Sequence, residues 1–167
     1  MGSGKSTAGK KLASLMGWTF IDLDKSIGDF AGKSIPEIFE QHGEKYFRKI
    51  ESELLRNIKA HTNTVISTGG GAPCYDDNMD FMLDTGLTIY LKLTPMQLRS
   101  RLTGSNDDRP LIKGLGPEEL LSYIEKKLSE REEVYSRSEL IVDGFDLDIN
   151  ALIYSIKLKQ NDQNSDF

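Results

Sequence analysis

Cysteine is almost absent from this sequence, and so are the features that mark secreted, membrane-spanning or nucleic-acid-binding chains. The single cysteine, Cys74, has no partner within the chain for a disulfide bond. No apolar run reaches membrane-spanning length, and no secretory signal peptide is recognisable. Basic residues number 21 against 26 acidic ones, which gives a net charge of -5 and no overall attraction to nucleic acid or anionic lipid. We therefore expect a cytoplasmic protein that binds neither.

Length and composition are those of one globular domain. A chain of 167 residues with 38% hydrophobic residues can close one hydrophobic core without disulfides or metals. We predict a single domain over residues 1–159, followed by a polar tail, 160–167, that is expected to be disordered. Because the average charge is acidic, any anion site has to be built locally, from backbone N–H groups and a few arginines.

Hydrophobic periodicity predicts that helices and strands alternate along the chain. Strands are predicted at 18–21, 64–68, 87–93 and 140–142, and helices at 5–16, 34–43, 44–61, 77–83, 95–102, 117–135 and 147–158. Such alternation favours an α/β fold with a parallel sheet. The segment 104–116 is rich in glycine, charge and turn formers, and it is the internal candidate for a mobile lid.

The segment at 2–7, Gly-Ser-Gly-Lys-Ser-Thr, opens the first predicted helix and matches the second half of the Walker A pattern. Glycines let consecutive backbone N–H groups turn around phosphate oxygens, and the helix N-terminus adds partial positive charge. Lys5 is placed to reach the β- and γ-phosphates, and the Ser6 hydroxyl to ligate Mg²⁺. The alternative is a glycine-rich helix start whose lysine is merely solvated. We predict ATP with magnesium as the ligand, held by Gly2, Ser3, Gly4, Lys5, Ser6 and Thr7.

A hydrophobic strand feeds this loop in P-loop folds, and the first glycine of the full motif would fall two residues before Met1. That strand lies in the middle of the sheet, so its loss would expose two strand edges and cost many kcal/mol against a total stability of about 5–15 kcal/mol. We therefore expect the first strand to be encoded upstream of Met1, the start having been misplaced or the sequence truncated. The intact mass of the protein from its native source tests this expectation.

Two carboxylates, Asp22 and Asp24, follow the strand predicted at 18–21. On an extended segment their side chains would face the same way. Asp22 is a candidate to hold Mg²⁺ through water, and Asp24 to accept or orient a substrate hydroxyl for in-line attack on the γ-phosphorus. The alternative is a solvated strand end with a helix N-cap.

The three glycines Gly69, Gly70 and Gly71 follow the strand predicted at 64–68, where open α/β sheets bind ligands. Without side chains they would let a ligand approach the main chain, although a plain flexible turn is the alternative. Arg48, Arg109 and Arg131 are candidates to grip a carboxylate or phosphate, since a planar guanidinium can do so bidentately. Any one of these arginines considered alone fits a surface ion pair better.

Together these segments resemble the shikimate kinase family. The resemblance runs from Met1 to about Leu158 and rests on 2–7, 22–24, 47–51, 67–71, 109–111 and 131–135. It implies a three-layer P-loop kinase fold, in which helices flank a parallel sheet and a lid lies near 104–116. It also implies transfer of the ATP γ-phosphoryl group to the 3-hydroxyl of shikimate, with helices at about 25–61 binding the substrate.

The same resemblance implies individual roles. Asp24, Arg48, Gly70 and Arg131 are similar to residues that bind shikimate, the arginines taking its carboxylate and Asp24 its hydroxyls, with Gly69 and Gly71 beside them. Arg109 belongs to the lid over the nucleotide phosphates and acts with Asp24 and Lys5 in catalysis, and Arg101 lies beside the adenine. A monomer is expected.

Two other functions remain open at this point. A gluconate-type or nucleotide kinase would share the P-loop and lid but need a different acceptor pocket. A P-loop module that binds nucleotide without turnover is the other alternative, and its only support is the missing first strand. The combination of Asp24, Arg48 and the three glycines favours a polyhydroxylated carboxylate as acceptor.

Overall fold

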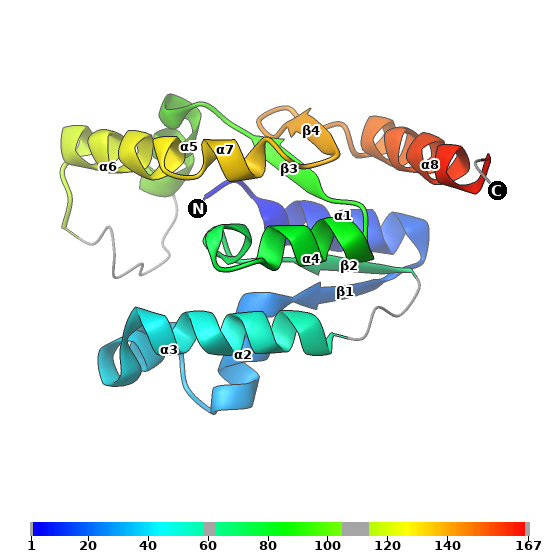
Figure 1. Ribbon diagram of the computed structural model, residues 1–167. Helices are drawn as coiled ribbons and strands as arrows, with labels where there is room; N and C mark the ends of the chain where they lie inside the picture. The colour runs from blue at the N-terminus through cyan, green and yellow to red at the C-terminus, as the bar shows by residue number, and fades with distance from the viewer. Residues whose placement is uncertain (1, 59–62, 105–113, 166–167) are drawn as a thin grey trace.

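Strands and helices alternate along the chain in the computed structural model, which describes residues 2–58, 63–104 and 114–165 (Figure 1). The elements are α1 (Lys5–Met16), β1 (Thr19–Asp22), α2 (Leu23–Ala31), α3 (Ile35–Asn57), β2 (Thr64–Ser67), the 3-10 turn η1 (Ala72–Cys74), α4 (Asn78–Thr85), β3 (Ile89–Lys92), α5 (Pro95–Thr103), α6 (Pro117–Ser129), α7 (Glu132–Tyr135), β4 (Leu140–Asp143) and α8 (Ile149–Ser165). The predicted α/β class is confirmed.

All the described strands pair in parallel. Strand β1 pairs with β2, so that Asp22 lies opposite Ser67, and β3 pairs with β4, so that Lys92 lies opposite Asp143. Within the described ranges the strands form these two pairs and no pairing joins β2 to β3. Because β1 and β2 end in register, the segments that follow them leave the same edge of the sheet side by side. The strand expected upstream of Met1 stays a prediction.

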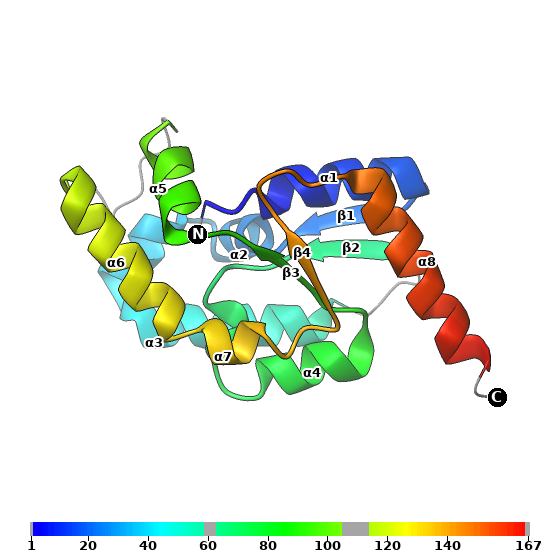
Figure 2. The ribbon, with the colours of Figure 1, turned by 90° about the horizontal axis from the view of Figure 1, so that it is seen from above.

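Helices cover both faces of the strands. Figure 2 shows α1 and the start of α8 on one side and α4 and α7 on the other, which confirms the predicted three-layer arrangement. Leu12 of α1 and Leu152 and Ile156 of α8 are buried together against residues of β2, β3 and β4, including Val65 and Ile89. This packing fixes α1, and with it the loop at 2–7, against the sheet.

A second core holds the helices that carry the acceptor-site candidates. Leu23 and Ile27 of α2 and Ile38 of α3 have no exposed surface. α3 starts with a capping box between Ser34 and Glu37, and it changes direction at Gly43, whose φ of 77° and ψ of 174° are not helical. Gly43 was the predicted boundary between two helices, and the structure confirms it.

A buried asparagine attaches the turn after β2 to α3. The Asn78 amide donates to Ser52 Oγ and to the Ala72 carbonyl, both at 2.9 Å, and its Oδ1 accepts from Arg56 Nη1 at 2.6 Å. Asn78 is fully buried, so these hydrogen bonds would be costly to lose. They hold η1, and the glycines before it, close to the middle of α3.

The structure corrects three local predictions. The helix predicted at 117–135 is two helices, with Arg131 between them at φ -122° and ψ -17°. The tail predicted to be disordered from residue 160 continues α8 as far as Ser165. Asp24 does not extend a strand, since β1 ends at Asp22 and α2 begins at Leu23. None of the described helices is both long and apolar enough to cross a membrane.

Candidate active site

The loop at 2–7, here called the P-loop, has the backbone that phosphate binding requires. Gly2 and Gly4 have φ values of 65° and 83°, the left-handed region that other residues rarely adopt. Gly4 caps α1, so the first N–H groups of the helix open toward the loop. The Lys5 ammonium lies 3.4 Å from Ser3 Oγ. Thr7, the last residue of the loop, is exposed to solvent. The glycine-rich loop predicted before the first helix is therefore present at the start of α1, and phosphate binding by this loop stays a prediction.

Ser6 and Asp22 meet although sixteen residues separate them. The Ser6 hydroxyl donates to Asp22 Oδ2 at 2.6 Å, and it lies 3.4 Å from the Ser67 hydroxyl. The other carboxylate oxygen, Oδ1, accepts from the Lys25 backbone N–H, so Asp22 is the N-cap of α2. A helix N-cap was the alternative role expected at this strand end, and Asp22 has it. The same carboxylate also lies beside the Ser6 hydroxyl of the P-loop.

Asp24 lies in the first turn of α2 and faces the glycines after β2. Its Oδ1 is 3.0 Å from the position that a β-carbon on Gly69 would occupy. Solvent still reaches Asp24, yet partial burial of its carboxyl raises its pKa, and the neighbouring Asp22 charge raises it further. The Lys5 and Arg48 cations oppose this rise. A carboxyl with a raised pKa between two cations suits proton transfer.

Arg48 is held by two glutamates on its own helix. Its Nη1 donates to Glu51 Oε2 at 2.5 Å, and its Nε lies 3.4 Å from Glu44 Oε1. The Arg48 side chain is 13% exposed and the Glu51 side chain is fully buried. One edge of the guanidinium is therefore fixed by the protein.

The glycines at 69–71, here called the glycine turn, leave the space that Arg48 and Asp24 occupy. A β-carbon at Gly69 would lie 2.6 Å from Glu51 Oε1, and one at Gly71 would overlap the Arg48 guanidinium. The φ of Gly71 is -91°, so space rather than backbone conformation excludes a side chain there. This distinguishes the glycine turn from a merely flexible one.

Glu51 has one oxygen without a hydrogen-bond partner in the described residues. Its Oε1 is buried and faces Gly69, while Oε2 accepts from Arg48. Burial raises the pKa of Glu51, and the Arg48 cation opposes that rise. Arg131 also favours the ionised form of Glu51.

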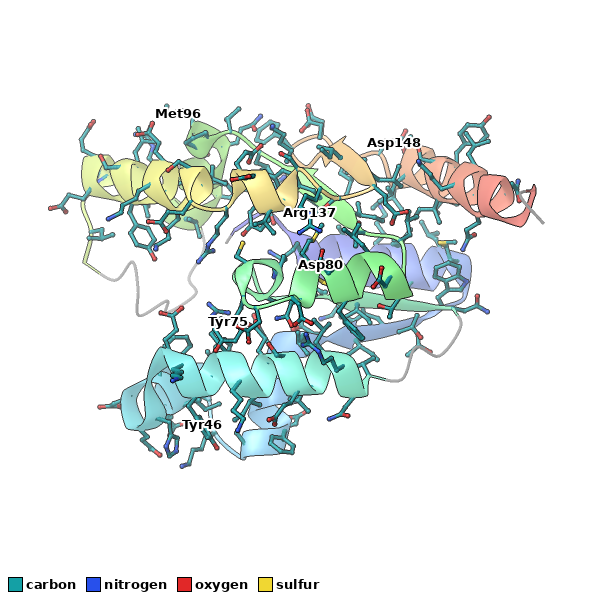
Figure 3. The ribbon with its side chains drawn as sticks, viewed as in Figure 1. Tyr46, Tyr75, Asp80, Met96, Arg137 and Asp148 are labelled. Carbon is teal, nitrogen blue, oxygen red and sulfur yellow. The ribbon has the colours of Figure 1, made fainter. Side chains whose placement is uncertain are left out.

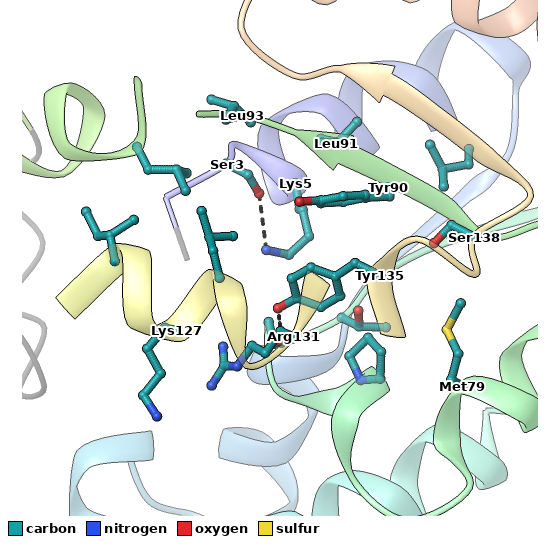
Figure 4. A pocket seen from close by; sticks show the side chains of 18 residues that line it. Ser3, Lys5, Met79, Tyr90, Leu91, Leu93, Lys127, Arg131, Tyr135 and Ser138 are labelled. Atoms are coloured by element: carbon teal, nitrogen blue, oxygen red, sulfur yellow. Dashed lines mark hydrogen bonds between the residues drawn. The ribbon is translucent and has the colours of Figure 1, made fainter. Parts of the chain in front are cut away.

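A cavity joins the P-loop to Arg131. Figure 4 shows Lys5, Tyr90, Arg131 and Tyr135 around it, and Gly70 also lines it. Arg131 reaches the cavity because the chain breaks between α6 and α7 at this residue. The cavity thus brings together Lys5, Arg131, Gly69 and Gly70, while Asp24 and Arg48 approach the glycine turn from α2 and α3.

Arg101 packs against the P-loop from α5. Its Nη1 donates to the Ser3 carbonyl at 2.8 Å, and its Nη2 donates to the carbonyls of Gly144 and Phe145. The guanidinium carbon lies 5.6 Å from the centre of the Phe145 ring. Arg101 therefore fixes the P-loop to the segment after β4. Arg109, the predicted lid residue, lies outside the described residues.

Glu51 and Tyr135 belong to the site, although the sequence assigned neither a role. Glu51 lies three residues after Arg48 on a helix, a spacing that places opposite charges side by side. Tyr135 lies four residues after Arg131 and donates from its hydroxyl to the Gly70 carbonyl. Helical spacing from each arginine is the sequence signal that could have indicated these two residues. Among the described residues no group of three or more histidine, cysteine, aspartate or glutamate side chains could hold a metal by itself.

Comparisons with known proteins agree with this geometry. The shikimate kinase family model matches residues 1–157. The chain is 43% identical over 144 residues to the shikimate kinase of Parabacteroides distasonis. The aligned residues cover 86% of this chain and 83% of that protein. The crystal structure of the Bacteroides thetaiotaomicron shikimate kinase superposes with a TM-score of 0.88 at 36% identity, over 96% of this chain and 94% of that one.

A third comparison concerns a liganded structure. The shikimate kinase of Acinetobacter baumannii, solved in complex with shikimate, has a TM-score of 0.82 at 31% identity, and the match covers 95% of this chain and 89% of that one. The match to the family model over nearly the whole chain and the level of identity to the relatives lead to one conclusion. This chain belongs to the shikimate kinase family.

Proposed function

We propose that the protein transfers the γ-phosphoryl group of ATP to the 3-hydroxyl of shikimate. One observation carries the proposal. The Asp24 carboxyl and the Arg48 guanidinium converge on the glycine turn, next to the P-loop that presents Lys5 and Ser6. An acceptor that carries hydroxyl groups as well as a carboxylate matches this site, because the base can take a hydroxyl and the two guanidinium groups can take the carboxylate. A nucleotide or an uncharged sugar matches it less well.

The P-loop and two arginines form the proposed ATP site. The N–H groups from Gly2 to Thr7 surround the phosphates, Lys5 carries positive charge to the β- and γ-phosphates, and Arg101 supports the loop from beneath. Arg109 is proposed to add charge from the lid. These groups stabilise the negative charge that spreads over the transferring phosphoryl oxygens in the transition state.

Ser6 and Asp22 fit a magnesium ion. They place two hard oxygen donors 2.6 Å apart beside the P-loop, and Mg²⁺ in kinases is held by one or two such side chains together with phosphates and water. Ser6 would ligate the ion directly and Asp22 through water. When bound, the ion neutralises phosphate charge and orients the γ-phosphate.

The acceptor side is proposed to work by positioning and proton transfer. Arg48 and Arg131 hold the shikimate carboxylate, which turns the ring so that its 3-hydroxyl faces Asp24. As the hydroxyl oxygen forms its bond to the γ-phosphorus, its proton passes to the Asp24 carboxylate, while the bond from phosphorus to the ADP oxygen breaks. Gly69, Gly70 and Gly71 let the substrate lie against the main chain.

A coupled ADP-release assay with shikimate, gluconate and nucleoside monophosphates tests the proposal. Turnover with shikimate that stops when EDTA removes magnesium is the expected result. Turnover only with gluconate or nucleotides would contradict it, and nucleotide binding without turnover on any acceptor would favour the inactive P-loop module. A Lys5→Met variant serves as the blank for contaminating kinases.

Replacement of Gly71 by alanine is expected to raise KM for shikimate about tenfold, because overpacking of this kind costs about 1–3 kcal/mol and the new methyl group would displace the Arg48 guanidinium. KM for ATP should stay within about twofold, since the three atoms nearest to the methyl group all belong to Arg48. Gly86→Ala is the matched control, because its φ of -176° suits any residue and no atom lies within 4 Å of the added carbon. Equal KM values for the two variants would show that Gly71 is not needed for space.

We also propose that the enzyme works as a monomer in the cytoplasm. The support for a monomer is that the fold of one chain already brings Lys5, Arg131 and Gly70 to one cavity. Light scattering at the concentration of the kinetic assay measures the oligomeric state, and activity confined to a dimer would contradict the proposal.

A further inference from the structure

Glu132 is a charged residue beside the cavity that the proposed reaction leaves without a role. It directly follows Arg131, which lies between α6 and α7 and lines the cavity. Its carboxylate accepts two hydrogen bonds from β3. The Tyr90 hydroxyl donates to Oε2 at 2.9 Å, and Lys92 Nζ donates to Oε1 at 2.6 Å. Both carboxylate oxygens of Glu132 are therefore bound by the strand.

We propose that Glu132 is a positioning residue that holds the start of α7 on β3 and so fixes the chain break that turns Arg131 toward the substrate carboxylate. The inference rests on the proposed function, because it takes the carboxylate of shikimate as the ligand of Arg131. It goes beyond that function by giving β3 a part in the affinity for the acceptor, through Tyr90 and Lys92.

The break at Arg131 is set by contacts across the fold rather than by the local sequence. Hydrophobic periodicity predicts one helix over 117–135, and none of Arg131, Glu132 and Glu133 is a helix breaker. Arg131 nevertheless has a φ of -122° and a ψ of -17°, and α7 begins at Glu132. Because Glu132 is the first residue after the break and is bound to another element, its hydrogen bonds can set the direction in which α7 continues.

Strand β3 is a fixed support for this attachment. It pairs with β4, so that Lys92 lies opposite Asp143, and the Lys92 carbonyl accepts from the Gly144 N–H at 2.9 Å. The Tyr90 ring lies 5.1 Å from the Tyr135 ring, centre to centre, and Figure 4 shows both rings at the cavity. The Tyr90 hydroxyl is therefore held by the packing of its ring as well as by the pairing of its strand.

Two further attachments hold α7 at and beyond its end. The Tyr135 hydroxyl donates to the Gly70 carbonyl. Arg137 forms an ion pair with Asp80 of α4, and the two side chains point toward each other in Figure 3. This ion pair is exposed, so it contributes little. Of these attachments, that of Glu132 lies closest to the break.

The protonation states of these groups suit a lasting attachment. Burial raises the pKa of Tyr90, and the Glu132 carboxylate raises it further, so the hydroxyl keeps its proton at neutral pH and donates. Burial by itself would raise the pKa of Glu132, but the hydrogen bonds from Lys92 and Tyr90 outweigh it and lower that pKa. Glu132 is therefore ionised at neutral pH. Because the Lys92 side chain is 56% exposed, we assign the larger contribution to Tyr90.

The first test compares Glu132→Ala with Glu133→Ala. KM for shikimate in Glu132→Ala is expected to rise about tenfold, the size expected for loss of a hydrogen bond to a charged group, with kcat and KM for ATP within about twofold. Glu133 is the matched control, because it is the next residue of the same helix and is exposed. A wild-type KM in folded Glu132→Ala, or an equal rise in Glu133→Ala, would overturn the inference.

Tyr90→Phe provides a measurement that does not depend on the stability of the alanine variant. It keeps the ring and removes the hydroxyl, so KM for shikimate should again rise about tenfold. Glu132→Gln keeps an oxygen that can accept from Tyr90, so its KM should lie between those of the wild type and Glu132→Ala. A wild-type KM in Tyr90→Phe would show that the hydrogen bond from β3 does not position Arg131.

Arg131 variants separate this inference from the proposed function. Arg131→Ala should raise KM for shikimate, and adding Glu132→Ala to it should raise KM no further, because the glutamate acts through the arginine. An unchanged KM in Arg131→Ala would contradict the proposed role of Arg131 in binding the substrate. Independent, multiplied effects of the two changes would contradict only the positioning role of Glu132.

Discussion

Replacement of Asp24 by asparagine is expected to lower kcat for phosphorylation of shikimate by about 10²-fold or more, the contribution typical of a positioned general base. Asparagine preserves the size of the side chain and an oxygen that accepts hydrogen bonds, but it cannot take up the proton of the attacking hydroxyl. KM for ATP should change little, because the P-loop contacts remain. Steady-state kinetics with both substrates varied provide the measurement.

Asp29→Asn is the matched control for this prediction. Asp29 lies on the same helix, α2, and is exposed. It should retain wild-type kinetics, whereas near-normal kcat in Asp24→Asn would remove Asp24 from the proton-transfer step. A fall confined to KM would leave it an orienting role only.

The pH dependence of kcat/KM gives a second expected result for Asp24. Burial and the Asp22 charge raise the pKa of its carboxyl above the ordinary value of 3.8. The ionised form is the base, so activity should rise with pH through this raised pKa and be lost below it. The acid limb should therefore lie above 3.8 and be absent from the residual activity of Asp24→Asn. A limb at or below the ordinary value would contradict the assignment.

Replacement of Arg48 by alanine is expected to lower kcat/KM for shikimate by about 10²-fold or more, mainly through KM, because it removes a nearly buried charged partner of the carboxylate. The same change leaves Glu51 buried without its cation, which in other proteins destabilises the fold by about 3–5 kcal/mol. The thermal unfolding midpoint should therefore fall together with the affinity.

A double variant separates binding from stability. Glu51→Gln added to Arg48→Ala removes the uncompensated charge, so the unfolding midpoint should recover in part while KM for shikimate stays high. Lys49→Ala is the control for loss of a cation on α3, since the Lys49 side chain is 72% exposed. Recovery of KM along with stability would mean that Arg48 acts only through the fold.

The elements of the acceptor site differ in how far the sequence predicted them. The P-loop was predicted in detail, because glycine, lysine and serine at fixed spacing before a helix have one common physical use. Arg48 and Arg131 were predicted as candidates, but their surroundings were not. Glu51 and Tyr135 follow these arginines at helical spacing, and spacing alone does not show which helix face turns toward the ligand.

Local sequence patterns gave a wrong prediction where a short-range hydrogen bond determines the backbone conformation. Asp22 was expected to continue a strand toward Asp24, yet its carboxylate caps α2 and turns the chain into a helix at once. The break before α7 had no strong signal in the sequence, because Arg131 and its neighbours are all acceptable in a helix. That break is what turns Arg131 into the cavity.

By itself the sequence determined the α/β class, the alternation of elements, the P-loop and the identity of the charged groups that could serve a phosphoryl transfer. These features follow from hydrophobic period and from spacing within one loop, both of which are local. Only the tertiary structure decided that Asp24, Arg48 and Arg131 face the same three glycines. The reason is that they come from α2, α3 and the junction between α6 and α7, and the packing of these helices against the parallel strands, rather than any local pattern, sets the distances between them.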